Sequence, residues 1–246
     1  SWSGSANMGM KYSDNGTTQM HEEIDLGMAA TGETDGGIAW KVEMGLDSNV
    51  TDDVRTGAAD VGSVSITGDF GTIRVGAASN AGTTVGIGDI GFDGSAIDSA
   101  AHKGRDAAGT HPDVQWNYTM DDIAIHASTE TSTDDTAVAL SWTSGTMAIA
   151  VSHSAAGASA ATANAISIGT SVGGFSVKGV AASNSVAASD SVGLSASMPV
   201  DGLGTVTFIT GSNDTDAKSS YGLGFSKSLG GSATLKGYYG SDTVSY

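Results

Sequence analysis

The chain has 246 residues, 36 of them glycine, and contains no cysteine, so a disulfide scaffold, a zinc site made of cysteines and thiol catalysis are excluded. Its 27 acidic residues oppose 10 basic ones, which gives a formal net charge of -17. This sign disfavours nucleic acid as a partner, because Lys and Arg supply most of the affinity for phosphates. No stretch approaches the roughly 18 consecutive apolar residues that mark a transmembrane helix.

Apolar and polar residues alternate with a period of two along the chain, which is the period of a β-strand. In the first segment Trp2, Met8 and Met10 alternate with polar residues such as Asn7 and Lys11. The alternation predicts fifteen strands, centred in chain order on residues 2–12, 24–28, 38–46, 64–67, 73–75, 114–120, 123–126, 138–142, 147–151, 166–168, 175–178, 192–198, 206–208, 221–225 and 235–239.

The connections between these segments alternate in length. One set is tight, at residues 68–71, 120–122, 144–145, 171–174, 199–203 and 228–231. The other set is generally longer and polar, at residues 46–61, 78–111, 129–135, 153–162, 182–189 and 211–217. Short turns at one end and long loops at the other describe an up-and-down antiparallel meander.

Two architectures fit such a meander. In a soluble sandwich or solenoid the apolar face packs inward, whereas in a membrane barrel it faces lipid and the polar face lines the lumen. The polar phase here is rich in Ser, Thr, Gly and Asn, and aromatic residues such as Trp2, Tyr12 and Trp40 share the apolar phase near strand ends. Fifteen strands are also many for a sandwich, and no fixed short solenoid repeat is visible. These features favour an all-β transmembrane antiparallel up-and-down β-barrel.

Three strings support a family resemblance: "SGSANMGMKY" at the start, "GSVSITGDFGTIRVGAAS" in the first third and "YGLGFSKSLGGSATLKGYYGSD" near the end. They resemble the trimeric general porins of alphaproteobacteria, which are 16-stranded barrels of the bacterial outer membrane. The resemblance implies a homotrimer in contact with membrane lipid and lipopolysaccharide, in which each chain is a passive diffusion channel for small hydrophilic solutes and ions.

The resemblance also implies one barrel domain over residues 1–246, with a final strand that ends in an aromatic residue. Here "SDTVSY" ends the sequence where a sixteenth strand is expected to start. Because such barrels have even strand numbers, roughly ten further residues are expected for that strand.

The longest irregular stretch, Ala78 to His111, corresponds by this resemblance to the third loop of the family, which folds into the barrel and narrows the pore. A loop of this size is usually functional. Its candidate acidic side of a constriction consists of Asp89, Asp93, Asp98 and Asp106, and the alternation turns three candidate basic wall residues toward the lumen, Lys11, Lys41 and Arg74. Opposed charges would orient dipolar solutes. The alternative is that these charged side chains are simply hydrated in a water-filled lumen and have no role in a constriction.

Other chemistry has weaker support. Asp89 and Asp93 in "GDIGFDG" are candidate calcium ligands, although the full spacing of an EF-hand is absent. The five histidines are scattered without metal-ligand spacing, and no serine elbow or dinucleotide motif occurs in its required context, so an enzyme is not expected. The alternative function is a non-conducting outer-membrane or surface β-protein, such as an adhesin, a phage receptor or a structural barrel, whose loops carry the function.

Overall fold

The computed structural model describes residues 1–12, 16–51, 54–59, 62–88, 90, 99–102, 105–107, 112–185, 189–214 and 218–241. Their contacts group the chain into two compact units, residues 1–78 with 113–116 and residues 79–112 with 117–246. No helix in the described part of the chain is long and apolar enough to cross a membrane.

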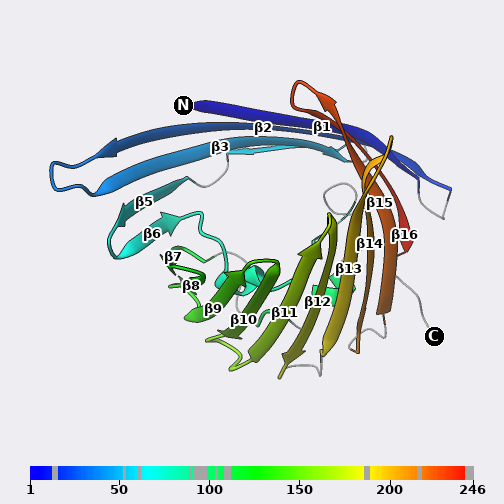
Figure 1. Cartoon of the computed structure of the whole chain (residues 1–246). Helices are drawn as coiled ribbons and strands as arrows, with labels where there is room; N and C mark the ends of the chain where they lie inside the picture. Colours follow the sequence, from blue (N-terminus) through cyan, green and yellow to red (C-terminus); the bar gives the residue numbers. More distant parts are fainter. Residues whose placement is uncertain are drawn as a thin grey trace. The chain divides into compact units, whose positions relative to one another are not determined.

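The first unit is an antiparallel sheet. Its strands are β1 (Trp2–Tyr12), β2 (Thr18–Glu33), β3 (Ala39–Thr51), β4 (Val54–Ala59), β5 (Ser63–Gly68) and β6 (Gly71–Gly76). β1, β2, β3, β5 and β6 pair in that order, and Figure 1 shows β1, β2 and β3 as long strands side by side. β7 (Val114–Met120) is divided between the two units.

The prediction of a loop at residues 46–61 is wrong, because most of this range is strand. β3 continues to Thr51 and pairs with β4 over Leu46–Thr51, while an earlier part of the same strand, Ala39–Glu43, pairs with β5. β4 and β5 therefore together take the place of one strand beside β3. The segment was missed because β-branched Val50, Thr51 and Val54 favour extended backbone without an apolar and polar alternation that would reveal it.

The second unit continues the meander. Its strands are β8 (Ile123–Glu130), β9 (Asp135–Ser144), β10 (Met147–Ala155), β11 (Thr162–Val172), β12 (Phe175–Asn184), β13 (Ser191–Val200), β14 (Gly204–Asn213), β15 (Lys218–Gly230) and β16 (Ala233–Ser241). Each pairs antiparallel with the next in chain order, and Figure 1 shows β9 to β14 as successive neighbours. The third-loop segment adds a 3-10 helix η1 (Ala81–Thr84) and a short helix α1 (Ser99–His102).

The pairing confirms the predicted alternation in both units. Met8 is 88 % exposed and Trp2 79 %, although both are large and apolar. Exposed apolar side chains that share this face occur on most strands, for example Leu26, Trp40, Met44, Val64, Leu140, Ile166, Leu194, Phe208, Leu223 and Tyr239. In each unit, exposed apolar side chains on one face and polar side chains on the other are the pattern of strands that cross a bilayer.

Fourteen of the fifteen predicted segments lie within a strand, and the segment 38–46 begins one residue before β3. Fifteen of the sixteen described strands follow one another along the sheet, with β4 off this path. Residues 242–246 lie outside the described residues, so the expected sixteenth strand stays a prediction. The expectation of one domain over residues 1–246 stays a prediction as well.

Candidate functional site

Three charged side chains meet on the polar face of the first unit. Lys41 lies opposite Ser65 on β5, and Ser65 lies opposite Arg74 on β6, so Lys41 and Arg74 are on one row across three strands. Glu43 is two residues further along β3 and therefore points to the same face. Its Oε1 lies 2.5 Å from Lys41 Nζ, and its Oε2 accepts a hydrogen bond from the Arg74 guanidinium. One carboxylate thus holds both bases.

The polar face also carries acids that are hydrogen-bonded to neutral partners. Ser5 Oγ donates to Asp25 Oδ2 at 2.8 Å, and Asn7 Nδ2 donates to Glu23 Oε2 at 2.9 Å. These are cross-strand pairs of β1 and β2 in direct register. Lys11, the third predicted base, lies on the same face of β1 opposite Gln19.

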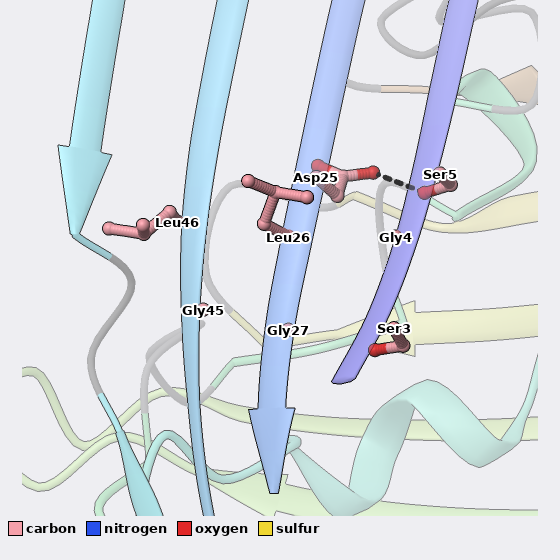
Figure 2. Close-up of a pocket in the computed structure, with 8 residues that line it drawn as sticks. All are labelled: Ser3, Gly4, Ser5, Asp25, Leu26, Gly27, Gly45 and Leu46. Atoms are coloured by element: carbon pink, nitrogen blue, oxygen red, sulfur yellow. Dashed lines mark hydrogen bonds between the residues drawn. The ribbon is translucent and has the colours of Figure 1, made fainter. Parts of the chain in front are cut away.

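A depression of about 360 Å³ lies beside the Asp25 pair. Figure 2 shows Ser5 turned toward the Asp25 carboxylate, with Gly27 and Gly45 next to each other on β2 and β3. Adjacent glycines leave the sheet without side chains at this place, which accounts for the hollow. It is an open surface hollow, and Leu26 and Leu46 line it together with the Asp25 carboxylate.

In the second unit the loop packs onto the polar face of the sheet. We call the polar face of these strands the wall. One buried cluster joins the loop to residues of four wall strands; its loop members are Val85, Ile87, Ile90 and Ala101, and its wall members are Ala150, Ala165, Val180, Ala182 and Ile209. Ala81 forms a second cluster with Ala137 and Ala139 of β9. Wall residues under the loop are thus mostly small. The expectation that the third loop folds against the lumen-facing side of the strands is met within this unit.

Polar wall side chains hold the loop by its backbone. Ser128 Oγ on β8 accepts from Ala81 N at 2.9 Å, and Ser154 Oγ on β10 accepts from Ala107 N at 2.8 Å. On β13, Ser191 Oγ donates to the carbonyl of Ala101 at 3.0 Å. Buried backbone groups need hydrogen-bond partners, and here the serine hydroxyls of the strands are those partners.

Asp106 is the one predicted loop acid within the described residues; Asp89, Asp93 and Asp98 lie outside them. Asp106 is half-buried, and its backbone carbonyl accepts from Asn184 Nδ2 at 3.3 Å. Its carboxylate is directed at η1, because a Cβ built on Gly82 would lie 3.1 Å from Asp106 Oδ2. The carboxylate therefore packs against the loop itself.

The second unit also contributes positive charge at the loop. Arg105 Nη1 donates to the carbonyl of Val85 at 3.1 Å, so this guanidinium is held against the loop backbone.

The calcium candidates Asp89 and Asp93 are among the residues outside the described part of the chain. Elsewhere, among the described residues, no group of three or more His, Cys, Asp or Glu side chains is arranged to hold a metal ion.

An up-and-down antiparallel sheet with an exposed apolar face, a polar face and a long loop packed on that polar face defines the class of transmembrane β-barrel channel proteins. A family model described as Gram-negative porin matches residues 1–245. The chain belongs to the Gram-negative porin family. It is a general diffusion porin of the bacterial outer membrane, through which small solutes and ions pass.

Solved porin structures share this fold. A triple variant of the porin from Rhodopseudomonas blastica matches with a TM-score of 0.84 at 14 % identity, covering 99 % of this chain and 94 % of that chain. A double variant of the same porin gives 0.83 at 15 % identity with the same coverage. A structure described as "Asymmetric conductivity of engineered proteins" gives 0.83 at 16 %, again with the same coverage. No curated protein sequence matches the chain.

Proposed function

We propose that loop 78–111 forms the constriction that selects solutes in this porin. The observation that carries the proposal is the packing of Val85, Ile87 and Ala101 onto the polar wall of the second unit. A loop in that position occupies part of the lumen cross-section, so that solutes pass along its free side. We propose a water-filled path rather than a closed apolar plug, because the polar face of the first unit carries charged side chains such as Asp25 and Lys41.

The charged side chains of the constriction are proposed as follows. Asp89, Asp93, Asp98 and Asp106 of the loop supply negative charge, and Lys11, Lys41 and Arg74 of the first unit supply positive charge. The pairing of Lys41 and Arg74 with Glu43 supports a weaker positive side than the two bases alone would give. With 27 acids against 10 bases in the chain, we expect a mild cation preference.

Single-channel recording tests the channel and its constriction. Purified protein added to a planar bilayer should give stepwise conductance increments, and deletion of residues within 91–98 should enlarge the increment. Absence of steps from correctly folded protein would favour the non-conducting alternative, in which the loops act as a receptor or adhesin surface. An unchanged increment in the deletion variant would remove the constriction role while leaving the channel intact.

The assembly proposed is a homotrimer embedded in membrane lipid and lipopolysaccharide, with one channel per chain and no enzymatic activity. Its support is the resemblance to trimeric general porins. Native mass spectrometry from detergent should give three times the protomer mass, and a monomer mass would contradict it.

Calcium at Asp89 and Asp93 is a further proposal, supported by the preference of Ca²⁺ for carboxylate oxygens. Calcium chloride should raise the melting temperature of the parent protein but not of the variant D89N/D93N. An equal response of both proteins would exclude this site.

A further inference from the structure

Two glycines of the wall lie directly beneath α1. Gly193 on β13 and Gly211 on β14 are register partners, and both lie under Ala101, whose exposed fraction is 0 %. A Cβ built on Gly193 would lie 2.3 Å from Ala101 Cβ, and one built on Gly211 would lie 2.6 Å from the same atom and 2.8 Å from Ala101 N. Carbon atoms in contact are normally about 3.5–4.0 Å apart, so neither position has room for a side chain.

A third glycine repeats the arrangement on the next strand. A Cβ on Gly224 of β15 would lie 3.1 Å from the Cβ of Ile90, another buried loop residue. The three wall glycines therefore follow the loop across β13, β14 and β15.

Backbone conformation does not account for these glycines. None of the three is among the residues with positive φ, so any L-residue fits their backbone. A glycine inside a strand loses more conformational freedom on folding and packs no side chain. The remaining physical reason for glycine at these three positions is that a side chain there would occupy the space that the loop fills.

We propose that Gly193, Gly211 and Gly224 form a seat that positions the loop, with Ala101 as the residue that enters it. The hydrogen bond from Ser191 Oγ to the Ala101 carbonyl and that from Ile87 N to His102 Nε2, both 3.0 Å, fix α1 over the seat. The depth of the seat sets how far the loop stands out from the wall. Its effect on the pore rests on the constriction role proposed above.

The seat predicts that a second substitution in the loop restores the loop position that a first substitution in the seat disturbs. Gly193→Ala places a Cβ against Ala101 and should lift the loop by more than about 1 Å, the amount needed to restore ordinary contact. Ala101→Gly removes the opposing Cβ and should let the loop return. Gly179→Ala is the matched control, because it makes the same change on neighbouring β12 where the nearest atom would be 3.8 Å away.

Thiol labelling reads the loop position directly, because the parent chain has no cysteine. Val85→Cys places a reporter in the buried cluster beside the seat, where the parent side chain is 0 % exposed. A water-soluble maleimide should label V85C slowly. Labelling should be roughly tenfold faster in V85C/G193A, as for a locally opened segment, and slow again in V85C/G193A/A101G and in V85C/G179A.

Ala101→Val tests the seat from the loop side without changing the wall strands, and V85C/A101V should also label fast even if G193A fails to fold. Equal protection of V85C/G193A and V85C/A101V with V85C would overturn the seat. Conductance of the same variants is a separate readout. Faster labelling with unchanged conductance would uphold the seat and remove the constriction role instead.

Discussion

Glu43 provides the sharpest test of the charge arrangement, because it alone among the described residues pairs with both Lys41 and Arg74. Two cations against one carboxylate carry a net charge of +1, and Glu43→Gln raises it to +2 without changing the side-chain shape. The substitution therefore isolates charge from packing on the polar face of the first unit.

The magnitude follows from Coulomb's law. One additional unit charge at about 6 Å from a passing ion in water contributes about 0.7 kcal/mol, which is about a threefold change in local ion concentration. The Debye length falls from about 10 Å at 0.1 M salt to about 3 Å at 1 M, so the effect should fade at high salt. We expect up to about a threefold shift of the permeability ratio toward anions at 0.1 M.

The assay is the reversal potential of single channels across a potassium chloride gradient. Glu22→Gln is the control, because Glu22 is exposed on β2 and lies in register with Met8 on the apolar face. It removes the same charge from the chain without touching the polar face. The parent reversal potential in E43Q at low salt, or an equal shift in E22Q, would contradict this role of Glu43.

Three further substitutions test side-chain packing and lipid contact. Gly237→Ala should cost about 1–3 kcal/mol in urea unfolding, because its Cβ would lie 2.4 Å from Phe225 Cε1; a cost no larger than that of G179A would contradict this packing. Ile209→Ala, at a fully buried position under the loop, should lower the unfolding free energy by about 2–5 kcal/mol, and a change below about 0.5 kcal/mol would place the loop elsewhere. Leu194→Arg, on the exposed apolar face, should cost about 2–4 kcal/mol in lipid bilayers, whereas tolerance there would argue against lipid contact.

Much of the fold was predictable because a strand that separates lipid from water must alternate. That rule placed fifteen of the sixteen described strands, and it turned Lys41 and Arg74 to one face. It failed for β4, since its pairing with β3 over Leu46–Thr51 extends where the alternation is lost. Strand ends were also underestimated, as in β2, where the clear alternation covers 24–28 but the strand runs from Thr18 to Glu33.

The arrangement of the site was harder to predict from the sequence than the fold. The grouping of Lys41, Glu43 and Arg74 needs the registers of β3 with β5 and of β5 with β6, which depend on residues distant in the chain. The glycine seat left only a faint signal, namely Gly193 and Gly211 in the polar phase of two strands. A strand glycine suggests close approach of another backbone, but not which segment approaches.

The class of this protein was already indicated by its sequence, because apolar and polar residues alternate with a period of two and the polar phase is rich in Ser, Thr, Gly and Asn. The tertiary structure alone decided how the loop lies on the wall and which carboxylate holds which base. Alternation is a local property of neighbouring residues and can be read from the sequence. The packing of Ala101 onto Gly193 and Gly211 instead joins residues 92 and 110 positions apart in the chain.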